Sequence, residues 1–138
     1  MSAATELETR AYPVTRADLV RYARASGDHN PIHQDEEVAR SVGLPGVIAH
    51  GMYTMALAAR AVQSWFPGAE VLSIGCKFTN PVVVPAEGVV EVVVAGAATE
   101  EADGLTTVRM TVTCGGVKVL GMPKAVVRAA GGTGAAGA

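Results

Sequence analysis

Residues 22–57, YARASGDHNPIHQDEEVARSVGLPGVIAHGMYTMAL, contain all three histidines of the chain. Within this stretch, residues 26–33 (SGDHNPIH) place an acid, two imidazoles, an amide and a proline in one short segment. Residues 49–52 (AHGM) then bring the third histidine and a glycine to the start of an apolar run. The rest of the chain is rich in Val, Ala, Gly and Thr, which build a scaffold and supply little chemistry. We therefore expect the functional residues to lie in this stretch.

The composition narrows the class of protein. A chain of 138 residues is large enough for one hydrophobic core and too small for two ordinary domains. Hydrophobic residues make up 49% and charged residues 17%, which favours a folded globule over a disordered chain. The net charge is −2 and no run of Lys or Arg is present, so nucleic-acid binding is not expected.

The first residues, the apolar stretches and the two cysteines indicate the expected cellular location. The first residues lack the basic and apolar regions of a signal peptide, and no apolar stretch approaches the roughly 18 residues that span a bilayer. Cys76 and Cys114 lie in strand-like apolar contexts and are expected to be reduced core residues. We expect a cytoplasmic protein with a flexible N-terminus (residues 1–10), one folded domain (11–128) and a disordered Gly/Ala tail (129–138).

Helix signals are clear in the first half of the chain. Thr15 and Asp18 have the spacing of a capping box, and Gly27 ends the helix that follows. Asp35 is expected to cap a second, short helix. The longest helix, residues 52–65, is apolar nearly all round, so we expect other structure to enclose it.

The second half reads as strands. Four Val- and Thr-rich runs are separated by turn signals such as Asp103-Gly104 and Gly115-Gly116: residues 71–78, 89–97, 105–114 and 117–127. Their short connections predict antiparallel pairing. A short edge strand is expected at residues 11–14, where Pro13 excludes a central position. The sequence predicts an α+β fold in which an antiparallel sheet curls around the long helix.

Asp28 and His33 are the strongest candidates for chemistry. A carboxylate and an imidazole on one constrained loop can hold a water molecule and move protons near pH 7. Pro31 lies between them and excludes regular α-helix. The simpler alternative is that Asp28 caps its own turn and His33 is a solvated loop residue.

The second candidate is the start of the long helix at His50 and Gly51. Free backbone N–H groups there can bind a carbonyl oxygen, and a glycine allows close approach. The alternative is that His50 only caps the helix. Asn30 is expected to tie the loop through its amide. His29 and His33 are four residues apart, a spacing that two metal ligands can have on one helix face. Pro31 excludes a helix here, so no metal site is expected.

With these residues in view, the chain resembles the MaoC-like family of (R)-specific enoyl-thioester hydratases and dehydratases. Residues 26–33 and 49–52 carry the likeness, which extends from Tyr12 to Val127. The small members with a single hot-dog unit are the most similar. Some family members carry a Ser in the central helix that assists the site, and Ala59 stands at that position here.

The resemblance implies a single hot-dog fold and the reversible dehydration of (3R)-3-hydroxyacyl thioesters to trans-2-enoyl thioesters, without metal or cofactor. It also implies a coenzyme A or acyl-carrier-protein substrate, and a homodimer or a heterodimer with a second hot-dog subunit. Asp28 and His33 would hold and deprotonate the water, and the Gly51 N–H would polarise the thioester carbonyl. The remaining motif residues would support the loop and the substrate: Asn30, His50 and Met52.

Two other functions stay open at this point. A hot-dog thioesterase would share the fold and the thioester substrate, but it would place a carboxylate on or beside the central helix. No acid lies between His50 and Pro67, which argues against it. A non-catalytic acyl-binding partner subunit would be expected to lack Asp28 or His33, and both are present.

Overall fold

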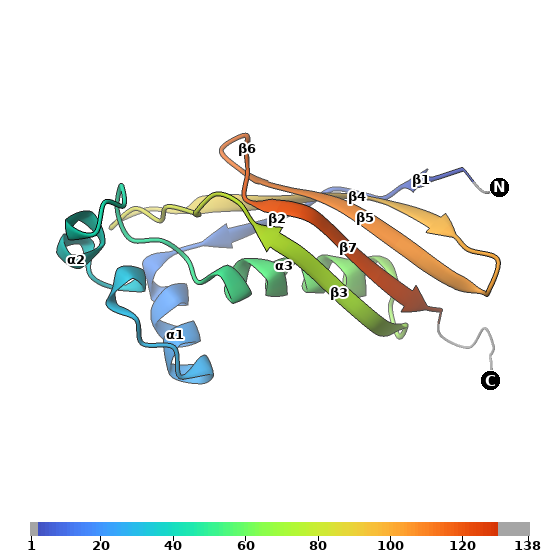
Figure 1. Ribbon diagram of the computed structural model, residues 1–138, viewed down its shortest axis with the longest axis horizontal. Coiled ribbons are helices and arrows are strands. Elements are labelled where there is room, and N and C mark those ends of the chain that lie inside the picture. The colour runs from blue at the N-terminus through green and yellow to red at the C-terminus, as the bar shows by residue number, and fades with distance from the viewer. Residues whose placement is uncertain (1–2, 130–138) are drawn as a thin grey trace.

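A curved antiparallel sheet packed over one long helix forms the body of the protein (Figure 1). The computed structural model describes residues 3–129. Helices α1 and α2 lie together at one end of the long axis, beside the start of the long helix α3. Within the described residues, no helix is both long and apolar enough to cross a membrane.

The sheet contains seven strands: β1 (Thr5–Glu6), β2 (Arg10–Val14), β3 (Glu70–Phe78), β4 (Val90–Glu100), β5 (Leu105–Cys114), β6 (Val117–Lys118) and β7 (Leu120–Arg128). The helical segments are α1 (Arg16–Ser26), the 3-10 turn η1 (Pro31–His33), α2 (Glu36–Ser41) and α3 (Gly51–Trp65). The strand order is β1-β4-β5-β7-β3, with β2 also paired to β4 and β6 to β5. This arrangement confirms the predicted α+β hot-dog fold.

One face of α3 supplies the centre of the core. Leu57, Ala58, Ala61 and Val62 are buried, and they join inward-facing valines of β4 and β5 in one hydrophobic cluster. The opposite face, which carries Met52, is exposed to solvent. The expectation that α3 is enclosed on all sides is therefore wrong within the single chain, because the sheet covers only one face of the helix.

The N-terminal segment is ordered by the sheet from Thr5 onward, which corrects the predicted flexible stretch for those residues. Thr5 and Glu6 pair with β4, and the Leu7 N–H donates to Gly96 O at 2.9 Å. The Trp65 indole N–H also donates to the Glu8 carbonyl, at 2.6 Å. The open edge of β4 thus gives the segment backbone partners. The predicted tail lies, apart from its first residue, outside the described residues.

The chain enters the central loop through a helix with defined ends. The capping box predicted at Thr15 and Asp18 is present, and Gly27 ends α1 in the left-handed conformation at φ 79°. The segment that follows contains one short 3-10 turn, η1, where only an extended loop or turn was expected. Pro31 fits there because the first helical position needs no N–H donor.

We expect Thr15→Ala to lower the free energy of unfolding by about 1 kcal/mol, because it removes the hydroxyl that accepts the Asp18 N–H. Urea unfolding of the purified protein measures the change. Thr9→Ala, at an exposed position outside helix and strand, is the matched control. Equal stability of the two variants would contradict the role of the cap.

Candidate active site

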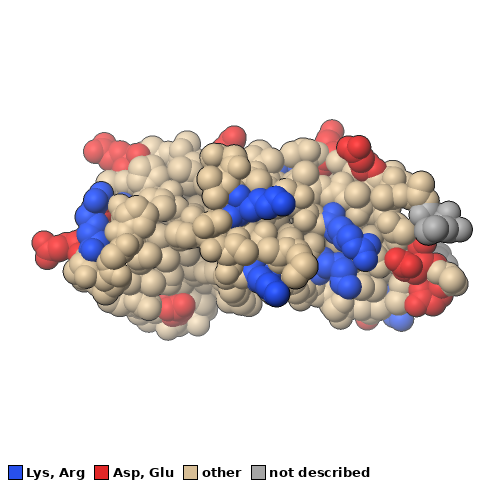
Figure 2. All heavy atoms as spheres, turned by 45° about the horizontal axis from the view of Figure 1, so that its top comes forward, with Lys and Arg blue, Asp and Glu red and all other residues tan. Residues whose placement is uncertain are grey.

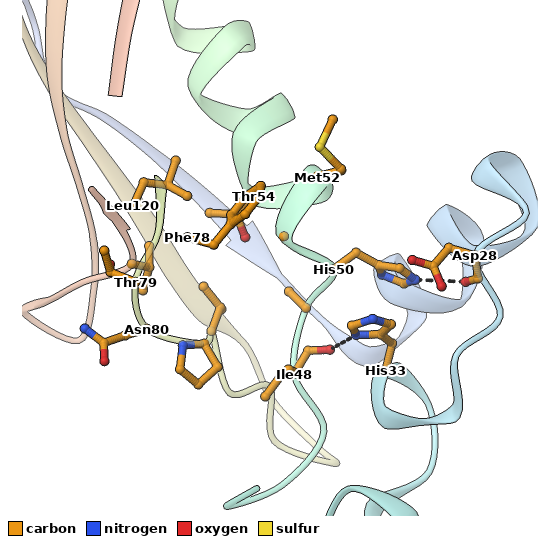
Figure 3. Close-up of a pocket in the computed structure, with 15 residues that line it drawn as sticks. Asp28, His33, Ile48, His50, Met52, Thr54, Phe78, Thr79, Asn80 and Leu120 are labelled. Atoms are coloured by element: carbon orange, nitrogen blue, oxygen red, sulfur yellow. Dashed lines mark hydrogen bonds between the residues drawn. The ribbon is translucent and has the colours of Figure 1, made fainter. Parts of the chain in front are cut away.

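Two imidazoles join the central loop to the start of α3 (Figure 3). His33 Nδ1 lies 2.7 Å from the Ile48 carbonyl oxygen, and His50 Nε2 lies 3.0 Å from the Asp28 carbonyl oxygen. A carbonyl oxygen only accepts hydrogen bonds, so each of these nitrogens carries a proton. The two rings stack with their centroids 3.9 Å apart, and both residues are buried.

The hydrogen bond to Ile48 fixes the chemistry of the other nitrogen of His33. With the proton on Nδ1, the neutral ring has a lone pair on Nε2 and can accept a proton there. A carboxylate oxygen of Asp28, a ring nitrogen of His33 and a ring nitrogen of His50 all lie within 4.8 Å of one another. The exposed Asp28 carboxylate and the buried His33 ring are therefore close enough to share one water molecule.

Burial lowers the pKa of His33 below the ordinary value of 6.5, because the charged ring would lose its hydration. The Ile48 carbonyl and the Asp28 carboxylate raise the pKa in part, and the neighbouring His50 lowers it. The net shift keeps His33 neutral at pH 7. A neutral ring is the form that can act as a base.

A cavity of about 420 Å³ opens in front of these residues. Asp28, His33, His50, Gly51 and Met52 line one side of it. The end of β3, the loop after it and the start of β7 form the other side, with these residues: Phe78, Thr79, Asn80, Pro81, Val82, Val119 and Leu120. The predicted residues thus come together, apart from Asn30, in a largely apolar cavity with a few polar groups at one end, as is usual for a small-molecule site.

Gly51 is the first residue of α3, so its N–H precedes the intrahelical bonds. The first N–H groups that bond back are those of Tyr53 and Thr54, both to the His50 carbonyl. A Cβ added at Gly51 would lie 3.0 Å from the Phe78 ring, so the cavity wall packs directly on this backbone. Because the Gly51 N–H precedes the intrahelical hydrogen bonds, the helix start can bind a carbonyl oxygen. The helix dipole favours negative charge there.

The remaining predicted residues shape the loop, lie at the cavity rim or begin the helix. The Asn30 side chain accepts the Ile32 N–H at 3.2 Å, a contact within the loop. Asp28 also accepts the Asn30 N–H at 3.2 Å, so it shapes its own turn while it faces the cavity. Met52 is 54% exposed at the cavity rim. His50 stands at the N-cap of α3, but its side chain makes no capping hydrogen bond.

Several lining residues were not identified from the sequence. Thr54 is buried on α3 and lines the cavity, and its hydroxyl on an otherwise apolar helix face was a signal that could have found it. Phe78 and Asn80 come from the end of β3 and the loop after it. Their sequence context carries no such signal.

Asp28, His33 and His50 are also residue types that can ligate a metal ion. His50 uses its Nε2–H on the Asp28 carbonyl, and its Nδ1 is buried without a hydrogen-bond partner among the described residues. Asp28 and His33 then offer two donors to the cavity, one fewer than the three protein ligands typical of catalytic zinc. This set of donors suits proton transfer better than metal binding.

The fold and the cavity define a hot-dog protein with an acid–imidazole pair facing a helix start. The family model of the MaoC like domain matches residues 2–127, and the chain belongs to this family. A solved MaoC-like dehydratase superimposes with a TM-score of 0.87 at 34% identity, over 94% of this chain and 41% of that one.

Curated relatives are similar over part of their length. The 3-hydroxyacyl-thioester dehydratase X of Mycobacterium tuberculosis is 44% identical over 73 residues, covering 53% of this chain and 25% of the relative. The mitochondrial 3-hydroxyacyl-[acyl-carrier-protein] dehydratase of Arabidopsis thaliana is 36% identical over 77 residues, covering 56% of this chain and 45% of the relative. The chain thus spans less than half the length of these two relatives.

We expect His33 to titrate below 6.5, and His50→Phe to raise its pKa, because the substitution keeps a stacked ring but removes the neighbouring imidazole that lowers the pKa. NMR titration of the histidine ring protons measures both values. His29→Phe, at an exposed position of the same loop, should leave the pKa of His33 unchanged. A fall in this pKa in His50→Phe would contradict the assignment.

Proposed function

We propose that the chain is a hydro-lyase that interconverts (3R)-3-hydroxyacyl thioesters and trans-2-enoyl thioesters plus water. The observation that carries this proposal is that the Asp28–His33 pair lines the same end of one cavity as Gly51, the first residue of α3. Hydration of an enoyl thioester needs a base for water and a donor for the carbonyl oxygen. Both groups are present at one end of the cavity.

The proton steps follow from the tautomer of His33. In hydration, His33 Nε2 accepts a proton from the water as the water oxygen bonds to C3 of the enoyl group. The Asp28 carboxylate accepts a hydrogen bond from the same water and fixes its orientation. The π electrons of C2 and C3 move toward the carbonyl, and His33 then returns the proton to C2. Dehydration follows the same steps in reverse.

The start of α3 stabilises the charge that develops on the thioester oxygen. As the enolate forms, the Gly51 N–H and the helix dipole become more favourable contacts than they are with the neutral carbonyl. An interaction that is stronger in the transition state than in the ground state accelerates the reaction. The apolar cavity wall excludes water from this contact and strengthens it.

The names of relatives support this reaction class. The proteins from Mycobacterium tuberculosis and Arabidopsis thaliana are named 3-hydroxyacyl dehydratases, and the latter name specifies an acyl-carrier-protein substrate. Asp28, His33 and Gly51 lie within the family match. Helix α3 (Gly51–Trp65) carries no carboxylate, so no observation favours a thioesterase.

The proposal includes assembly with a second hot-dog unit, either another copy or a different subunit, in the cytoplasm and without a cofactor. β3 is the last strand of the sheet, and Leu72 and Phe78 on it are exposed, as is Met52 on α3. An open strand edge with apolar side chains favours pairing with another chain. One structure with the same fold, at 21% identity, is the ChsH1–ChsH2 complex of Mycobacterium tuberculosis.

We expect Asp28→Asn and His33→Ala each to reduce kcat for crotonyl-coenzyme A hydration by about 10²–10⁴-fold, the usual contribution of general acid–base groups. Loss of the enoyl absorbance measures the rate. His29→Ala, on the same loop but exposed, should keep the wild-type rate. A near-normal rate in either site variant, with an unchanged circular dichroism spectrum, would refute the assignment.

Gly51→Ala should lower kcat/KM for the same substrate, because the new methyl group would meet the Phe78 ring at 3.0 Å and hinder the approach of the carbonyl. Gly75→Ala is the matched control, since nothing lies within 4 Å of the methyl position there. Steady-state kinetics of both variants decide the matter. Equal activity of the two would remove the carbonyl-binding role of Gly51.

A further inference from the structure

Most cations of the chain already have partners. Of the 11 Lys and Arg residues, these make ion pairs: Arg10, Arg16, Arg21, Arg40 and Arg128. Arg60 lies over the Tyr12 ring. Among the described residues, five cations remain outside these contacts, and four of them lie on the strands: Lys77, Arg109, Lys118 and Lys124. We call these four residues the basic face.

The strand register places the basic face on the outer side of the sheet. Arg109 on β5 is directly opposite Lys124 on β7, and both side chains are exposed, whereas the neighbouring Val108 and Ala125 are buried. Lys124 is in turn opposite Gly75 on β3, two residues before Lys77. Side chains alternate between the two faces of a strand, so these cations point away from α3.

Figure 2 shows Lys and Arg side chains across the middle of one face of the molecule, with Asp and Glu toward its ends and margins. The sequence agrees, since residues 74–78, 108–114 and 117–124 contain no acid. Like charges directly opposite each other on a sheet are destabilising. Arg109 and Lys124 are such a pair, and the fold provides no acidic residue in these segments to neutralise it.

The basic face is larger than one phosphate group. Two strand spacings separate β5 from β3, or about 10 Å, and Lys118 is opposite Thr113, about 13 Å along β5 from Arg109. Beside Arg109 and Lys124, a hollow of about 500 Å³ includes Met122, which is 74% exposed. An apolar side chain among spread cations suits the surface of an acidic protein better than a small anion.

The basic face also adjoins the cavity. The Lys118 carbonyl accepts hydrogen bonds from Thr79 Oγ1 at 3.3 Å and from Asn80 Nδ2 at 2.9 Å, and both of these residues line the cavity. Lys77 directly precedes Phe78 of the cavity wall. A partner on the basic face would therefore lie beside residues that line the cavity.

We propose that the basic face is the docking surface for an acyl carrier protein that presents Asp and Glu side chains. This inference rests on the proposed function and names the carrier that delivers the thioester. A second copy of the chain does not fit through the same face, because two copies of a cationic face repel each other. A long nucleic acid would also cross the acidic ends seen in Figure 2.

The test compares one acyl group on two carriers, crotonyl-acyl carrier protein and crotonyl-coenzyme A, with wild type and Lys124→Glu. The substitution places a negative charge directly opposite Arg109, so the melting temperature should stay the same or rise. We expect kcat/KM to fall about tenfold or more for the carrier-protein substrate and to stay within about twofold for the coenzyme A substrate. Arg24→Glu, an exposed α1 position with the same charge change, should alter neither value.

Titration with holo-acyl carrier protein separates this inference from the reaction itself. Weaker binding by Lys124→Glu, but not by Arg24→Glu, supports docking even if neither substrate is turned over. Absence of turnover would contradict only the proposed reaction. No binding by wild type, equal binding by all three proteins, or equal loss on both substrates overturns the inference. Lys124-dependent binding of phosphatidylserine vesicles or an RNA oligonucleotide, with carrier-protein binding unaffected, would also overturn it.

Discussion

The site depends on two hydrogen bonds from imidazole N–H groups to backbone carbonyls. His33 donates to Ile48, and His50 donates to Asp28, so each ring holds the segment that carries the other. The bonds cross between a loop and a helix start that are separated in sequence, and the stacked rings close the contact. Because both rings are buried, these donors would be costly to leave without acceptors. The loop therefore has little freedom to move relative to α3.

The sheet determines where that loop and helix can stand. α3 buries one face against β4 and β5, which leaves its N-terminus beside the ends of β3 and β7. The cavity forms where the helix start, the loop and these strand ends meet (Figure 3). Its titratable groups come from the loop and the helix start, and its apolar wall comes largely from the ends of β3 and β7 and the loop after β3. Packing and chemistry are thus supplied by different parts of the chain.

The same strand segments serve two faces of the sheet. Inward, Phe78, Val119 and Leu120 line the cavity, while Lys77 and Lys118, one residue away, belong to the outer basic face. The alternation of side chains along a strand makes this division possible within a few residues. The arrangement places the proposed carrier surface and the proposed catalytic groups within one compact part of the fold.

The sequence by itself determined the local structure: the capping box at Thr15, the left-handed Gly27 and the alternating strands, because each depends on neighbours a few residues away. It also identified Asp28, His33 and Gly51 as candidates, since their motif is compact. Only the tertiary structure decided which His33 nitrogen carries the proton and that Phe78 packs on Gly51. It likewise ordered the residues after Thr5 and exposed one face of α3. These features depend on distances between separate elements. Sequence periodicity indicates which face of an element is apolar, but not which residues of other elements lie against it.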